Sequence, residues 1–176
     1  MPFTPYHFGP AGFLGLVFKK RIDIPAFVLA NVAVDIEPLA LMIFRVSGNH
    51  HRFFHTLIGA TLAGIALAIA LFPPRKIIAE LMNLLHLPYE TTFLKITIWA
   101  VLGGWFHVFI DSICHWDVRP FWPSRIRPLY WLVNYDQLKY ICLGFWLAAI
   151  ILLLCAYIGE IIGKAKSLTE QGAVDK

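Results

Sequence analysis

The sequence has 176 residues, of which 59% are apolar and 15% are charged, and its formal net charge is +4. Soluble domains carry roughly 45–50% apolar and about 25% charged residues, so this composition excludes an ordinary water-soluble globule and an intrinsically disordered chain. The positive charge is also too small and too dispersed for a nucleic-acid-binding surface. We therefore expect an integral membrane protein that does not bind nucleic acid.

Four stretches of the chain are long and apolar enough to cross a bilayer, which takes about 20 mostly apolar residues. They are Ile24–Phe44, Phe53–Phe72, Phe93–His115 and Tyr140–Gly159. The second and the fourth stretch contain no charged residue, whereas the first and the third each contain acids. The sequence predicts an all-α helical bundle with about four transmembrane helices.

Shorter segments between these stretches suit the membrane surface. Ala11–Lys20 is an apolar helix too short to span, and Arg75–Leu87 has the apolar periodicity of an amphipathic helix. Trp116–Leu138 forms an aromatic loop whose tryptophans and tyrosines suit the headgroup level. We expect one membrane-embedded domain over residues 1–163 and a polar C-terminal tail over residues 164–176.

Several ionisable residues lie inside or beside the apolar stretches. They are Asp35, Glu37, His55, His107, Asp111 and His115, with His50 and His51 just before the second stretch. An ionised acid at the bilayer centre costs about 2.5–3.5 kcal/mol on insertion scales. These acids must therefore pair, reach water or bind a cation.

The spacing of these residues brings them together. His107, Asp111 and His115 are each four residues apart and therefore share one face of a helix. His51 and His55 share a face as well if their helix starts early enough. Because consecutive spans run in opposite directions, all of these residues fall near the same side of the membrane. We expect one polar site at one end of the bundle.

Histidine and carboxylate ligands together suit Zn²⁺, Mn²⁺ or Fe²⁺. The predicted metal ligands are Asp35, His51, His55, His107 and Asp111. A catalytic zinc site uses about three protein ligands and leaves one position for water. The candidate ligands exceed the need of one ion, so two metals are possible.

Other residues near this side could serve a substrate. Glu37 or His115 could transfer protons as a general base. Arg52 and Arg119 could hold an anionic group such as a phosphate, since arginine binds phosphate through paired hydrogen bonds.

Five segments resemble one known family over roughly residues 1 to 140. They are MPFTPYHFGP at residues 1–10, NVAVDIEP at 31–38, HRFFHT at 51–56, HVFIDS at 107–112 and RPFWP at 119–123. The combination resembles the YdjM-like membrane-bound metal-dependent hydrolases of bacteria and archaea. The resemblance implies an inner-membrane protein whose metal ligands are His7, Asp35, His51, His55, His107 and Asp111. His7 enters this set through the resemblance alone.

Three functions follow as hypotheses. The first is a hydrolase that uses a metal-activated water, with zinc as the first choice of metal and manganese or iron as alternatives. Its substrate would be an amphiphilic membrane lipid, of the phospholipid or isoprenoid phosphoester type. The second is a b-type haem electron carrier with His55 and His107 as axial ligands. The third is a transporter or scaffold whose intramembrane acids relay protons or pair structurally.

The distribution of basic residues predicts how the protein is oriented in the membrane. Nine lysines and arginines fall on the side of the membrane opposite the site, and six fall on the site's own side. Because cytoplasmic loops carry the excess of basic residues, this distribution predicts a site that faces outward.

Overall fold

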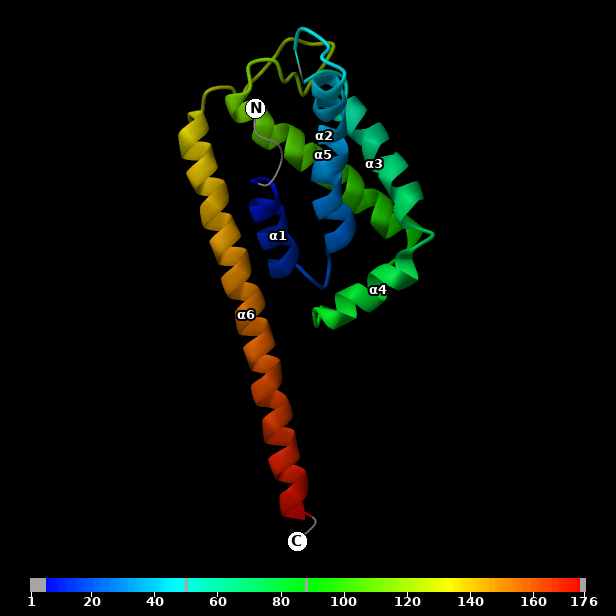
Figure 1. The fold of residues 1–176 in the computed structure, drawn as a ribbon, viewed down its shortest axis with the longest axis vertical. Coiled ribbons are helices and arrows are strands. Elements are labelled where there is room, and N and C mark those ends of the chain that lie inside the picture. Colours follow the sequence, from blue (N-terminus) through cyan, green and yellow to red (C-terminus); the bar gives the residue numbers. More distant parts are fainter. Residues whose placement is uncertain (1–5, 50, 88, 175–176) are drawn as a thin grey trace.

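The computed structural model describes residues 6–49, 51–87 and 89–174, and these residues form six α-helices and no strand (Figure 1). The helices are α1 (Phe8–Val17), α2 (Ile24–Ile43), α3 (Leu57–Leu71), α4 (Arg75–Leu84), α5 (Phe93–Cys114) and α6 (Tyr135–Val174). The prediction of an all-α fold is confirmed.

Three of these helices are long and apolar enough to cross a membrane: α2, α5 and the Tyr135–Gly159 part of α6. The α3–α4 pair qualifies only as a unit and is bent by 86° at its break. The structure thus has three to four candidate spans, in agreement with the predicted bundle. Two of the predicted boundaries, those of α2 and α5, are correct to within one residue.

Helix α3 is shorter than the predicted span Phe53–Phe72. Thr56 has an extended backbone, and its hydroxyl accepts a hydrogen bond from the N–H of Gly59 at 2.9 Å, so the helix begins at Leu57. The helix ends at Leu71, just before a pair of prolines. As a result, His51 and His55 lie in the connection before α3. They therefore do not share a helix face, which would have required the helix to begin before His51.

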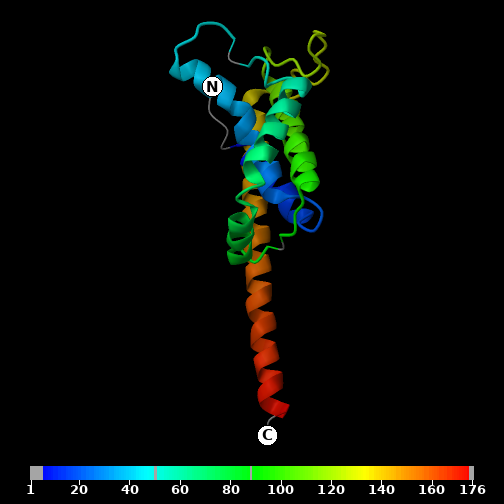
Figure 2. The ribbon, with the colours of Figure 1, turned by 90° about the vertical axis from the view of Figure 1, so that its right-hand side faces the viewer.

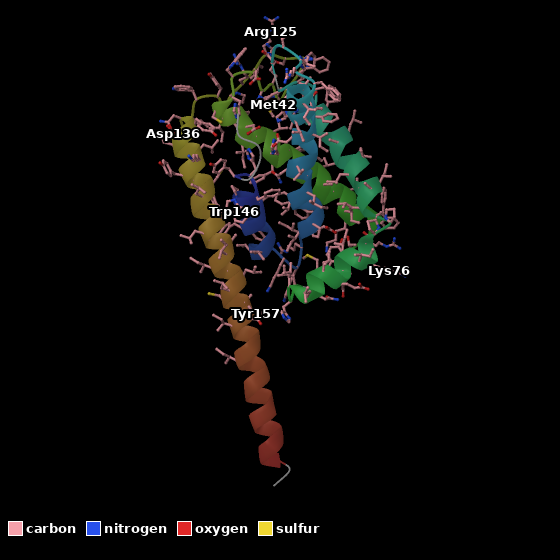
Figure 3. The ribbon with its side chains drawn as sticks, in the orientation of Figure 1. Met42, Lys76, Arg125, Asp136, Trp146 and Tyr157 are labelled. Carbon is pink, nitrogen blue, oxygen red and sulfur yellow. The ribbon has the colours of Figure 1, made fainter. Side chains whose placement is uncertain are left out.

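The two predicted short helices are present as α1 and α4, but α1 begins and ends three residues earlier than the predicted Ala11–Lys20, and α4 ends three residues before the predicted Leu87. Helix α1 lies lengthwise beside α6 within the bundle (Figure 1), and its Gly9, Pro10 and Ala11 are buried. Helix α4 turns away from α3 at the far end of the bundle, where Figure 3 places Lys76. Arg125 marks the opposite end, which contains the polar site.

Helix α6 extends well past the other helices (Figures 1 and 2). Its 40 residues correspond to roughly 60 Å at 1.5 Å per residue, whereas the hydrocarbon core of a bilayer is about 30 Å thick. The helix continues through Val174 and so includes most of the segment for which the sequence predicts a polar tail, residues 164–176.

Glycines bring α5 close to its two neighbours. A Cβ atom on Gly103 would lie 2.3 Å from the carbonyl oxygen of Phe27 in α2. A Cβ atom on Gly64 of α3 would lie 2.8 Å from the backbone nitrogen of Val101 in α5. Small residues at such crossings let the helix backbones approach closely. This approach sets the distance between the polar residues of α2 and α5.

We expect Gly103→Ala to lower the thermal unfolding midpoint of the detergent-solubilised protein. The added methyl must displace the backbone of α2, and overpacking of this kind costs about 1–3 kcal/mol. The matched control is Gly144→Ala in α6, where a Cβ atom meets nothing within 4 Å. Equal midpoints for Gly103→Ala and the wild type would contradict this account of the helix crossing.

Candidate metal centre

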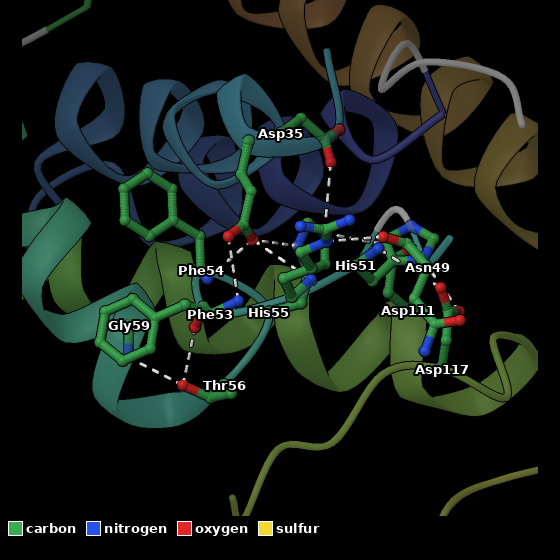
Figure 4. A network of polar contacts seen from close by, with 12 residues as sticks. Asp35, Asn49, His51, Phe53, Phe54, His55, Thr56, Gly59, Asp111 and Asp117 are labelled. Atoms are coloured by element: carbon green, nitrogen blue, oxygen red, sulfur yellow. Dashed lines mark hydrogen bonds and ion pairs between the residues drawn. The ribbon is translucent and has the colours of Figure 1, made fainter. Parts of the chain in front are cut away.

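The polar residues meet at the end of the bundle where α2 and α5 terminate. Asp35 comes from α2, and His107 and Asp111 come from α5. His55 comes from the connection before α3 and is fully buried. Figure 4 shows Asp35, His55 and Asp111 close together at this end.

Asp35, His55, His107 and Asp111 form an inner group of four buried side chains. The Nε2 atom of His55 lies 3.4 Å from Oδ1 of Asp35 and 3.4 Å from Oδ2 of Asp111. The Nε2 atom of His107 lies 3.2 Å from the same oxygen of Asp35 and 3.3 Å from that of Asp111. The two Nε2 atoms are 3.4 Å apart.

These distances fit a single transition-metal ion. Ligand atoms about 2.0–2.2 Å from a tetrahedral zinc ion are separated from one another by roughly 3.3–3.6 Å. The five separations in the inner group lie between 3.2 and 3.4 Å. The donors also have the right chemistry, with two imidazole nitrogens and two carboxylate oxygens. The inner group could therefore hold a metal ion.

An outer group consists of His51, His115 and Asp117, whose ligand atoms lie within 4.8 Å of one another. His51 Nδ1 is 3.0 Å from Oδ1 of Asp117. Asp111 lies between the two groups: its Oδ2 is 3.9 Å from Nε2 of His51, and its Oδ1 is 4.0 Å from Nε2 of His115. One carboxylate thus faces both groups.

His7 also reaches Asp111. It directly precedes α1, and its Nε2 lies 3.0 Å from Oδ1 of Asp111. All six predicted metal ligands therefore lie at one site, although His51 and His55 reach it from a loop rather than from a helix face. His50 lies outside the described residues.

Glu37 holds the loop that carries His55. Its carboxylate accepts hydrogen bonds from the backbone N–H groups of Arg52, Phe53 and Phe54 at 3.3, 3.0 and 2.8 Å. The same carboxylate lies 3.8 Å from Nδ1 of His55. These contacts make Glu37 an anchor for the ligand loop, while its expected role in proton transfer stays a prediction.

Burial and neighbouring charges shift the pKa values of the site residues that lie in loops. Burial disfavours the imidazolium form of His55, but hydrogen bonds to Asp111, Asp35 and Glu37 outweigh burial and raise the pKa of His55 well above its ordinary value. Burial opposes ionisation of Asp117 too, yet its hydrogen bond with His51 lowers the pKa of that carboxyl to about 2. Burial lowers the pKa of His115. A proton on His55 is thus stabilised by the carboxylates around it.

The two predicted phosphate-binding arginines lie outside the ligand groups. Arg52 and Arg119 line a cleft of about 480 Å³ that also reaches His51 and Asp117. Part of the Arg52 guanidinium is used within its own loop, where it donates to the backbone carbonyls of Asn49 and Ser47 at 2.9 and 3.3 Å. Among the described residues, no hydrogen bond occupies the guanidinium of Arg119.

Asp117 is the site residue that the sequence analysis missed. It lies in the aromatic loop two residues after His115, where the helix has ended and the four-residue spacing no longer applies. The available signal is the His-Trp-Asp triplet at the C-terminus of α5, next to an intramembrane histidine.

The fold and the site together define an all-helical membrane protein with a buried histidine–aspartate group able to bind a metal. The family model described as YdjM inner membrane protein matches residues 11–166, and the chain belongs to this family. The matched range contains every predicted site residue except His7, and the resemblance seen in the sequence is confirmed. No curated protein and no solved structure matches the chain.

We expect Glu37→Gln to weaken metal retention by about 10- to 100-fold, the usual cost of losing a residue that orients a ligand. A glutamine keeps one acceptor oxygen and turns an NH₂ group toward backbone N–H donors, which loosens the loop of His55. Chelator competition on the metal-loaded protein measures the effect. Glu80→Gln, on the exposed surface of α4, is the control. Identical retention in the two variants would contradict the anchoring role.

Proposed function

We propose that this protein is a metal-dependent hydrolase of the inner membrane that cleaves a phosphoester bond in an amphiphilic substrate. The observation that carries the proposal is the inner group, in which two imidazoles and two carboxylates converge at metal-ligand spacing inside an apolar bundle. Asp35, His55, His107 and Asp111 would hold zinc, with manganese or iron as alternatives. When bound, such an ion supplies a nucleophilic water at neutral pH and polarises the phosphoryl oxygen.

A second metal position is supported by the outer group. Asp111 would serve both positions, since its two oxygens face different histidines. His51 and Asp117 would supply the remaining ligands. His7, 3.0 Å from Asp111, would either complete this position or orient the shared carboxylate.

His115 is a better candidate than Glu37 for the proton-transferring group. His115 lines the cavity beside Asp111, whereas the oxygens of Glu37 accept backbone hydrogen bonds. His115 would therefore accept a proton at Nε2. The site would face outward, in accord with the distribution of lysine and arginine.

The two other hypotheses receive less support. In a bis-histidine haem the two imidazoles lie on opposite faces of the macrocycle, but Nε2 of His55 and His107 are 3.4 Å apart and both face the same two carboxylates. A non-catalytic transporter or scaffold accounts for the paired charges and would retain its function after chelation.

We expect gently purified wild-type protein to contain at least one divalent ion per chain. His107→Ala and Asp111→Ala should lose this ion, because each removes a donor from the inner group. His86→Ala, whose ring contacts Tyr157 away from the site, is the control and should keep the ion. Elemental analysis decides between the outcomes, and metal-free wild-type protein would refute the proposal.

We expect Arg119→Gln to raise the KM for a phosphodiester substrate about ten-fold or more with a smaller effect on kcat. Loss of a charged hydrogen bond to phosphate costs about 1.5–3 kcal/mol, and Arg119 lies in the cleft next to His51 rather than among the ligands. Arg125→Gln, on the exposed end of the molecule, is the control. An unchanged KM in Arg119→Gln would remove this residue from substrate binding.

A further inference from the structure

An apolar groove of about 380 Å³ lies between α1, α5 and α6, beside the metal centre. Its volume falls in the range of small-molecule sites, roughly 300–1,000 Å³. Phe106, Ile110 and Ile113 of α5 line one wall, and Leu138, Ile141 and Phe145 of α6 line the other. None of these six side chains carries a hydrogen-bonding group, so the groove suits a hydrocarbon.

The groove and the metal ligands occupy neighbouring faces of the same helix. On α5, Phe106 and Ile110 each directly precede a ligand, His107 and Asp111. Successive residues of an α-helix are about 100° apart around its axis. A molecule in the groove therefore lies beside the face of α5 that carries His107 and Asp111.

The groove adjoins the cavity that contains several of the candidate metal ligands. Leu138 and Cys142 of α6 line both the groove and the cavity, which also contains His7 and Asp111. Lys139 lines the cavity as well, with its Nζ 5.9 Å from the ring centroid of Tyr6. A cation thus lies in the cavity that shares two wall residues with the groove, where an anionic group attached to a hydrocarbon chain would be placed.

The groove follows two candidate membrane-spanning helices. From the cavity it extends along α5 from Ile113 to Phe106 and along α6 from Leu138 to Phe145. Seven residues of helix correspond to roughly 10 Å, directed from the end of the bundle toward its middle. A lipid chain in this groove would lie along these two candidate membrane-spanning helices.

We propose that this groove binds one hydrocarbon chain of the substrate and places the attached phosphoester at the metal centre. The inference rests on the proposed hydrolytic function and makes it more specific. The chain lies on the α6 side, and the polar part of the substrate extends to the cleft of Arg52 and Arg119. His51 lines both the cavity and that cleft, so the phosphoester would lie between them.

The test compares two p-nitrophenyl phosphodiesters, one with a methyl and one with a dodecyl group, on metal-loaded protein in lipid nanodiscs. We expect the wild type to prefer the dodecyl ester in kcat/KM by about ten-fold or more, the effect of burying two methylene groups. Ile141→Trp should bring this ratio close to one, because Ile141 is 46% exposed and its replacement fills the groove. Leu143→Trp, 41% exposed on α6 but outside the groove, should keep the wild-type ratio.

A second readout separates failure of the groove from failure of hydrolysis. Dodecyl phosphate, but not methyl phosphate, should raise the thermal unfolding midpoint of the wild type and of Leu143→Trp, and it should leave that of Ile141→Trp unchanged. If neither ester is hydrolysed but this pattern holds, the groove stands and the hydrolytic function fails. If Ile141→Trp keeps the chain-length preference or the stabilisation, or if the wild type shows neither, the groove proposal is overturned.

Discussion

The carboxylate of Asp111 is the group on which the rest of the site depends. Five imidazole rings have a nitrogen within 4.0 Å of it: those of His7, His51, His55, His107 and His115. A buried carboxylate in an apolar bundle is stable only if a positive charge compensates it. Protonated His55 can contribute such a charge, and a divalent cation could do so with the release of that proton. The side chains gathered around Asp111 could thus hold a metal ion.

Two structural features bring these ligands within reach of one another. Close packing at Gly103 and Gly64 lets α5 approach α2 and α3, so that donors on different helices converge at distances near 3.3 Å. Glu37 then holds the loop before α3 against α2 through three backbone hydrogen bonds. In the inner group, the rigid helices α2 and α5 therefore carry three donors, while the anchored loop carries the fourth, that of His55.

The surroundings of the site divide into a polar and an apolar side. The cleft of Arg52 and Arg119 opens on one side, and the groove between α1, α5 and α6 opens on the other. A fully water-soluble substrate would leave the groove unoccupied, and a purely apolar substrate would make no ionic contact with the arginines. The proposed amphiphilic phosphoester matches both, with its reactive group at the buried histidine–aspartate group between them.

Composition and spacing alone were sufficient for the all-α membrane fold, for the limits of α2 and α5, and for the pairing of His107 with Asp111, because hydropathy and helical periodicity are local properties. They also indicated that Asp35, His51 and His55 belong to the same end of the bundle, since spans alternate in direction. Only the tertiary structure showed that His51 and His55 act from a loop, that Asp117 joins them, and that an apolar groove adjoins the site. These features depend on hydrogen bonds and helix packing between residues far apart in the chain, which no local pattern encodes.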